Sequence, residues 1–357
     1  MKRGFRLGTA LALAGVAASL AVTAAVAGPF TWMKKSAGIQ ACGLMPDTKT
    51  SVRWEQFDKP YLEKAFKAAG VSARVVNAQG DPQKQKTQAD QCLSDGAKVL
   101  IIAPNDSASA AAIERDAKAK GAVSIDYDRQ VEGGNAVLYV SFDNHKVGVL
   151  QGTAIANALK SKHGAVVAEL NGGREDANAF LFKGGYDSVL GPLYKSGALK
   201  KGPDQFVPAW DNPTAGKIFE QMLVKTGNKI DGLVVANDGM ANAAIVALKT
   251  HKLKPIPTSG QDATTQGVQN IIAGWQTMTV FKDVRKQATA TARAAIAIVR
   301  GKKAPTTGFV TTKGRSKEPA YLISPETITK ANYKKLFTSG FLKKSDVCTG
   351  EYKKFCK

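Results

Sequence analysis

Short apolar runs rich in β-branched residues alternate with helical patterns along most of this chain. The first set of runs is AGIQACGLM, ARVVNAQ, AKVLIIAPN, AVSIDYD and VLYVSFD, with helical patterns near residues 62–69 and 107–120. A second set is AVVAELNGG, QFVPAW, IDGLVVAND and IPTSGQD, with helical patterns near 180–190, 213–224 and 241–248. This alternation predicts an α/β fold with two doubly wound parallel sheets of similar size, each covered on both faces by helices.

Three elements follow these two sets. They are the strand-like run TMTVFKD, an Ala-rich helical stretch over residues 284–299, and a polar tail. We interpret them as the chain returning to complete the first lobe.

The N-terminus predicts export. Lys2, Arg3 and Arg6 precede an apolar stretch over residues 7–27 that ends in Ala25-Val26-Ala27. This pattern is typical of a secretory signal peptide over residues 1–27, and it implies a periplasmic or extracellular protein. A membrane anchor is the alternative, because about 20 apolar residues can span a bilayer. The Ala-rich composition and the cleavage pattern favour the signal peptide.

The formal net charge is +21 at pH 7. A charge of this size suggests a polyanionic partner. The basic residues are spread over many segments, however, and no aromatic-basic nucleic-acid signature is present. We therefore expect no nucleic-acid partner, and attraction to an anionic cell envelope is the more natural use of the charge.

Four cysteines in an exported chain indicate disulfide bonds. Cys348 and Cys356 lie close together in the tail CTGEYKKFC, and we expect them to pair. Cys42 belongs to a predicted strand and Cys92 to a predicted helix nearby. These two form either a second disulfide or two buried thiols.

Polar residues gather where several predicted strands end, and ligands bind at such ends in open α/β sheets. The pairs are Asp128-Arg129, Asp143-Asn144, Asn237-Asp238 and Gln261-Asp262. Each pair can also cap the helix that follows it. Carboxylates, amides and a guanidinium that converge from two lobes suit a neutral polyol, whose hydroxyls both donate and accept hydrogen bonds. An aromatic ring such as Trp210 can cover the apolar face of a sugar.

The sequence lacks the common motifs of catalytic, phosphate-binding and metal-binding sites. It has no nucleophile elbow and no Walker phosphate loop, and Gly172-Gly173 does not extend to GxGxxG. No CxxC occurs, and the histidines are not spaced as metal ligands; they are His145, His163 and His251. We predict no catalytic residue, metal or cofactor. A secreted sugar-modifying enzyme remains an alternative, whereas a sugar-responsive repressor would need a helix-turn-helix where this chain has an export signal.

Seven runs, in order, carry a family resemblance: RWEQFDKPYL, YDR, SFDNHKVGVLQ, LNGGREDANAFLF, VVANDG, SGQDA and IIAGWQTMTVFKD. They closely resemble the D-xylose-binding and multiple-sugar-binding proteins of ABC sugar uptake, over about Gly38 to Asp346. The resemblance implies the fold named periplasmic binding protein type I. It also implies a monomer that captures a monosaccharide, D-xylose above others, and delivers it to the membrane permease of an ABC importer. A receptor for glucose, galactose and arabinose that also serves chemotaxis or sensing is the alternative.

The resemblance implies a set of sugar-binding residues by position. They are Arg53, Asp128, Arg129, Asn178, Trp210, Asn237, Asp262 and Lys282, with Asp238 and Phe180 as further candidates. In the family pattern, the Asp-Arg pair grips adjacent hydroxyls and the tryptophan stacks on the sugar. This chain departs from the pattern next to Asn178, where it is one residue shorter and carries Ala177 in place of another asparagine. Packing is the expected role of Trp54 and Phe57.

The resemblance also implies two lobes joined by a three-segment hinge that closes over the sugar. We expect the first lobe to comprise residues 28–143 and 277–306, and the second lobe 144–276 and 313–357. The predicted crossings lie near Asp143-Asn144, near Trp275–Thr277 and between about residues 306 and 313.

Overall fold

The first sheet has seven strands, all parallel except one edge strand. The computed structural model describes residues 38–48 and 51–356, so the predicted signal peptide and residues 28–37 lie outside the described residues. The strand order is β10 (Gly308–Thr312), β11 (Arg315–Ile323), β5 (Leu138–Phe142), β4 (Val123–Tyr127), β3 (Val99–Ile102), β1 (Ala41–Met45) and β2 (Ala73–Asn77). Only β10 runs antiparallel to its neighbour. β1, β3 and β5 are fully buried, as strands covered on both faces should be, whereas β2 and β11 are partly exposed.

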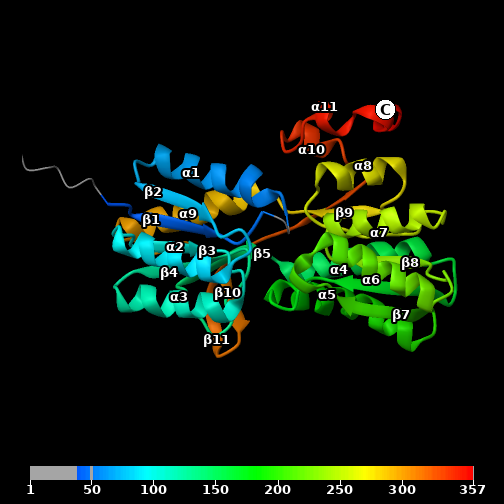
Figure 1. Cartoon of the computed structure of the whole chain (residues 1–357), viewed down its shortest axis with the longest axis horizontal. Helices are drawn as coiled ribbons and strands as arrows, with labels where there is room; N and C mark the ends of the chain where they lie inside the picture. The colour runs from blue at the N-terminus through cyan, green and yellow to red at the C-terminus, as the bar shows by residue number, and fades with distance from the viewer. Residues whose placement is uncertain (1–37, 49–50, 357) are drawn as a thin grey trace, which may run out of the picture. The chain divides into compact units, whose positions relative to one another are not determined.

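Helices cover both faces of this sheet. α1 (Lys59–Ala68) and α9 (Val284–Val299) pack together on one face, and α2 (Pro82–Ser94) and α3 (Ser107–Ala119) pack together on the other (Figure 1). Side chains of β1 alternate between the two faces, so Ala41 and Met45 join the core beneath α1 and α9. Cys42 and Leu44 point the opposite way, into the core beneath α2 and α3.

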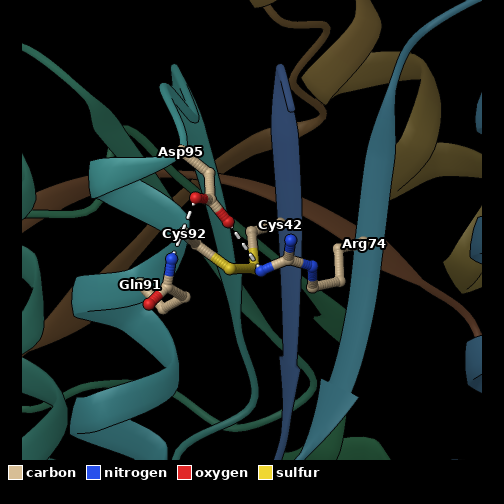
Figure 2. Close-up of a disulfide and its surroundings, with 5 residues drawn as sticks. All are labelled: Cys42, Arg74, Gln91, Cys92 and Asp95. Carbon is tan, nitrogen blue, oxygen red and sulfur yellow. Dashed lines mark hydrogen bonds and ion pairs between the residues drawn. A yellow bond between two sulfur atoms is a disulfide. The ribbon is translucent and has the colours of Figure 1, made fainter. Parts of the chain in front are cut away.

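This alternation brings Cys42 to Cys92 of α2, and the two form a disulfide with Cα atoms 6.2 Å apart. The two residues are therefore not separate buried thiols. Figure 2 shows Arg74 and Asp95 beside this disulfide, paired at 2.8 Å between Nη1 and Oδ2. Gln91 donates to the same carboxylate at 2.9 Å. The disulfide joins the strand next to the edge of the sheet to a covering helix inside the first lobe.

The second sheet is built around three parallel strands in the order β7 (Leu199–Phe206), β6 (Ala165–Asn171) and β8 (Gly232–Val235). Isolated bridges at Thr258 and Gln261 connect β8 to β9 (Met278–Phe281), which pairs antiparallel with β12 (Glu326–Thr329). α4 (Asn144–Leu159) and α5 (Ala177–Lys195) pack together, and so do α6 (Asn212–Lys225), α7 (Asp238–Thr250) and α8 (Thr265–Ala273).

Two predicted strands of this lobe differ from the structure. The run QFVPAW contains only the end of β7, and its last residues form a 3-10 turn over Pro208–Trp210. The run IPTSGQD forms bridges rather than a strand. Proline has no N–H for a sheet ladder, and Pro255 and Pro257 precede the bridges directly.

The lobe boundaries differ from the prediction at two crossings. β9 belongs to the second sheet, so the chain enters the first lobe at Lys282-Asp283 rather than near residues 275–277. β10 and β11 belong to the first sheet, because β11 hydrogen-bonds to β5. The chain therefore leaves the first lobe at Ser324-Pro325 rather than between 306 and 313. The late elements thus complete both sheets and not the first alone.

The C-terminal segment packs on the second lobe. It contains α10 (Lys335–Thr338), α11 (Lys344–Val347) and the 3-10 helix η3 (Gly350–Phe355), and α11 and η3 contact α8. The predicted disulfide between Cys348 and Cys356 is present, with Cα atoms 5.8 Å apart. In the part of the chain that the structure describes, no helix has the length and apolar character needed to span a bilayer.

Candidate functional site

The eight residues of the predicted sugar-binding set line one cavity, whereas the two further candidates do not. Its walls are Ser51, Arg53, Trp54, Asp128, Arg129, Asp176, Asn178, Phe182, Trp210, Asn237, Gln261, Asp262 and Lys282. Ser51, Trp54, Asp176, Phe182 and Gln261 were absent from the predicted set. Trp54 also has the expected packing role, since it is buried in the first-lobe core. Phe180, Asp238 and Phe57 lie outside this cavity.

Strand ends position these side chains. Asp128 follows β4, Asn237 follows β8 and Lys282 follows β9, each within two residues of its strand's last residue. Carboxyl ends of parallel strands meet at one edge of a sheet, where ligands bind in open α/β folds. Arg53 comes from the loop after β1, just before the π-helix η1 (Trp54–Asp58).

Arg53 is buried, and most of its N–H donors are used within the protein. Its Nε and Nη2 donate to Asp58 at 2.9 and 2.7 Å, its Nη1 donates to Asp128 at 2.7 Å, and Nη2 also donates to Gln287 at 2.9 Å. A guanidinium has five N–H donors. Four of them are used in these contacts, so one Nη1 hydrogen remains for a ligand. The main role of Arg53 is to orient Asp128.

Asp128 is held ionised by its neighbours. Burial alone would raise the pKa of its carboxyl, but Arg53, Lys282 and Arg129 outweigh burial and hold the pKa well below its ordinary value. Lys282 Nζ lies 3.7 Å from this carboxylate and 3.9 Å from that of Asp262. Burial raises the pKa of Asp262, and Lys282 and Arg53 oppose that rise. The site thus offers charged acceptors beside a buried ammonium donor.

Arg129 connects the two lobes. Its Nε lies 3.0 Å from Asp176 Oδ2, its Nη1 donates to the carbonyl of Pro104 at 3.1 Å, and its guanidinium lies 5.5 Å from the Trp54 ring centroid. Asp176 caps α5 by accepting from the Asn178 N–H at 2.9 Å. The sequence signal for Asp176 was a good capping residue just before a helix, which does not distinguish a cap from a site residue.

Asn178 is a second link between the lobes. Its Nδ2 donates to the backbone carbonyl of Asp128 at 2.9 Å. Its Oδ1 accepts from Asn144 Nδ2 at 2.8 Å, and the hydroxyl of Tyr139 lies 3.2 Å away. Protein groups therefore occupy much of the capacity of this side chain.

Backbone strain is concentrated at the cavity. Eight non-glycine residues of the described chain have a positive φ, and they include Asp128 (65°), Trp210 (55°) and Asp262 (91°). Ala209 and Ala263, which adjoin two of these, have φ values of 52° and 49°. Such conformations are costly for residues with a side chain, and they gather at binding and catalytic sites.

Trp210 belongs to both the core and the cavity. It is 5% exposed, and its ring meets Phe182 edge-to-face with centroids 6.2 Å apart. Gly172 is required beneath it, because a Cβ there would lie 2.2 Å from ring carbons. Within the described residues, no group hydrogen-bonds to the buried Nε1 of Trp210 or to the buried Oε1 of Gln261. The cavity wall thus presents an unpaired donor and an unpaired acceptor.

The remaining predicted residues have defined positions. Asn237 Oδ1 caps α7 by accepting from Met240 N at 2.9 Å. Phe180 is 46% exposed and packs at a tilt against Phe206, with ring centroids 5.1 Å apart, and it does not line the cavity. Asp238 lines a neighbouring, larger cavity, and so does Phe57. Among residues 38–48 and 51–356, no group of three or more His, Cys, Asp or Glu side chains could hold a metal ion.

Comparisons with known proteins identify the family of this chain. Residues 42–303 match a family model described as a periplasmic binding protein domain. The chain is 33% identical over 307 residues to the D-xylose-binding periplasmic protein of Escherichia coli (strain K12), covering 85% of this chain and 92% of that protein. It is 34% identical over 348 residues to the multiple sugar-binding periplasmic receptor ChvE of Rhizobium radiobacter, covering 92% and 97%.

Solved structures agree as well. An ABC transporter solute binding protein from Clostridium phytofermentans with bound β-D-glucose superimposes with a TM-score of 0.82 at 30% identity, covering 86% of this chain and 99% of that one. The fold is that of type I periplasmic binding proteins. The chain therefore belongs to the periplasmic binding protein family, among its sugar-binding members.

Proposed function

We propose that this protein binds a neutral monosaccharide, D-xylose above others, and delivers it unchanged to the permease of an ABC importer. One observation carries the proposal: Trp210 Nε1 and Gln261 Oε1 are buried without partners in the wall of a cavity that also holds Asp128, Arg129 and Lys282. An unpaired buried polar atom costs free energy that a bound partner recovers. A sugar hydroxyl both donates and accepts, so it satisfies either atom.

The side chains divide into two roles in this proposal. Asp128 and Asp262 accept from hydroxyls, and Lys282 and Asn237 donate to them. Arg53 and Asn178 hold these groups in position, because most of their own hydrogen-bonding capacity is used within the protein. Trp210 contributes its N–H as well as the apolar surface of its ring.

D-xylose is the first candidate because two relatives are named for it, but identity does not separate these from the multiple sugar-binding relatives. Two D-xylose-binding proteins match at 33% identity, whereas the multiple sugar-binding relatives match at 33 and 34%. A glucose receptor is the second candidate, since the similar structure from Clostridium phytofermentans holds β-D-glucose. The two sugars differ by one hydroxymethyl group, which the cavity must either accommodate or exclude.

Ligand capture would couple to hinge closure. The ion pair between Arg129 and Asp176 and the contacts of Asn178 join the lobes at the cavity itself. A sugar that binds between the lobes would stabilise this closed arrangement, as in other hinge-closing receptors. We propose that the closed form is recognised by the permease, after export of a monomer directed by residues 1–27.

The test is a thermal-shift screen of the mature protein against aldopentoses and aldohexoses, followed by calorimetric titration of those that raise Tm. We expect D-xylose to give the largest shift and NMR to recover it unchanged after hours of incubation. Asp128→Asn should weaken binding by at least about tenfold, the loss of one charged hydrogen bond. Asp187→Asn, at a half-buried position of α5 that lines neither cavity, is the matched control. No shift with any sugar, or turnover of the sugar, would refute the proposal.

A further inference from the structure

A second and larger cavity adjoins the sugar cavity. It has a volume of about 720 Å³, which is within the range of small-molecule sites. Ser51, Arg53, Asn237 and Asp262 line both cavities. The two are therefore separated by no more than these side chains. The first cavity measures about 30 Å³ in this structure, so a sugar ring can enter it only if the side chains or lobes around it move, and a ring that does so lies next to the second cavity.

Three helices begin at this second cavity. The N-terminal parts of α6, α7 and α8 contribute Asn212, Asn242 and Gln266 to its wall, and the first-lobe residue Gln56 also lines it. Asn212 Oδ1 is buried, and no described group donates to it. The wall thus combines amide side chains from two lobes with an acceptor that has no partner in the protein.

The charges in the wall favour a neutral occupant. Asp238 is already satisfied, since its oxygens accept from Gln276 Nε2 at 2.7 Å and from Thr264 N at 2.9 Å. Arg53 is held by two aspartates. Lys217 and Glu220 are of opposite sign and lie in the same helix, so neither sign dominates. Asp262, which also lines the wall, lies 3.9 Å from Lys282, and the wall as a whole carries both signs of charge.

The rest of the wall is apolar. Phe57 stacks on Phe341 with centroids 5.0 Å apart, and Ala243 and Val246 of α7 line the cavity as well. Val246 is 52% exposed, so it lies at the rim. Amides for hydroxyls and apolar surface for C–H faces are the combination that a sugar ring requires.

We infer that the second cavity receives a second neutral sugar ring, so that the protein binds disaccharides as well as the monosaccharide they contain. This inference rests on the proposed function, because the first ring occupies the sugar cavity. The second ring would contact both lobes, through Gln56 on one side and Asn212 on the other, and would add to the stability of the closed form.

Calorimetric titration of the mature protein tests this with D-xylose, xylobiose, D-glucose and cellobiose. We expect the disaccharide of the preferred sugar to bind with an affinity equal to or greater than that of the monosaccharide. Val246→Trp fills the rim of the cavity and should weaken disaccharide binding by about tenfold or more, the scale of an overpacked contact, while leaving monosaccharide affinity within about twofold. Val224→Trp, a 75% exposed position on α6 outside the cavity, is the matched control.

Asn212→Ala provides a second, smaller change if Val246→Trp lowers Tm strongly. It should reduce disaccharide affinity roughly fivefold and leave the monosaccharide unaffected. Disaccharides that fail to bind while monosaccharides bind would overturn the inference and leave the proposed function intact. The inference would also be overturned if neither variant changed the affinity for disaccharides. Failure of every sugar to bind would overturn both.

Discussion

At the scale of single residues, the buried indole N–H of Trp210 allows a sharp test. Trp210→Phe keeps most of the ring and removes the donor. We expect sugar affinity to fall by roughly tenfold, the worth of one hydrogen bond, as measured by calorimetry. The Tm of the ligand-free variant should change little, because the loss of buried ring volume and the removal of an unsatisfied buried donor act in opposite directions.

The control for this variant is Trp275→Phe, which changes a partly buried tryptophan packed near Lys249. Unaltered sugar affinity in Trp210→Phe would show that the indole N–H does not meet the ligand. Trp210→Ala is unsuitable as a binding test, because the burial of this ring in the second-lobe core predicts a stability loss of about 3–5 kcal/mol.

Asp238 predicts a dependence of stability on pH. Burial raises its pKa to about 7, even though hydrogen bonds from Gln276 and Thr264 act in the opposite direction. A carboxyl with a raised folded-state pKa stabilises the fold fully below its ordinary pKa of about 4, and this contribution is lost as pH rises to about 7. The loss amounts to about 4 kcal/mol if no other group compensates.

We therefore expect the protein to melt at a higher temperature at pH 5 than at pH 8. Asp238→Asn should reduce that difference, because the amide does not titrate. Thermal melts of both proteins across this range provide the measurement, with Asp187→Asn as the control. If the melting temperature changes equally with pH in the wild type and in Asp238→Asn, the raised pKa of the Asp238 carboxyl is contradicted.

The sequence could locate the site residues. It could not show which of them are available to a ligand and which hold other side chains in position. Asp128, Asn237 and Lys282 follow apolar strands, so their convergence at one sheet edge could be expected. The bond between Arg53 and Asp58 could not, because their spacing of five residues depends on the π-helical turn η1. Asp176 was missed because a helix cap and a cavity residue look the same in sequence.

At the scale of elements, strand pairing explains why two of the predicted crossings between the lobes differ from the structure. A strand pattern shows that a segment is extended but not which sheet it joins. β9 and β11 lie at the edges of their lobes' parallel cores, and only their backbone partners, Gln261 and β5, assign them. The doubly wound class, by contrast, could be predicted because it follows from the alternation of strands and helices.

The two disulfides differ in the length of chain that they close. Cys42 and Cys92 are 50 residues apart, and loop entropy predicts a stabilisation of about 4 kcal/mol. Cys348 and Cys356 are 8 apart, for which it predicts about 2.5 kcal/mol. Denaturant unfolding of the two double Cys→Ala variants should rank them in this order. The reverse ranking would show that the C-terminal packing on α8 depends on its own disulfide more than chain entropy requires.

At the scale of the whole molecule, Tyr139 tests the coupling between lobe contact and binding. Its hydroxyl lies 3.0 Å from the Asp128 carbonyl, 3.2 Å from Asn178 Oδ1 and 3.1 Å from Asn144 Nδ2. It does not line the sugar cavity. Tyr139→Phe should nevertheless weaken sugar binding by about three- to tenfold, because it removes a link that favours the closed form.

Stopped-flow fluorescence should place this loss in faster dissociation rather than slower association. Tyr321→Phe, on β11 and outside the cavity, is the control. If dissociation rates are equal in wild type and Tyr139→Phe, the contacts between the lobes do not contribute to ligand retention.

Strands of the two sheets alternate along the chain, and this order decides when each sheet can be completed during synthesis. The first sheet contains β5 and β11 as neighbours, yet the whole second-lobe sheet except β12 is translated between them. At roughly 5–20 residues per second, a ribosome needs on the order of 10–30 s to make the chain from β5 to β11. Throughout that interval β5 has an open edge, and the face of the sheet that α9 covers stays exposed until α9 is made. The first lobe is begun first and finished late, so its sheet cannot be completed until β11 has been made.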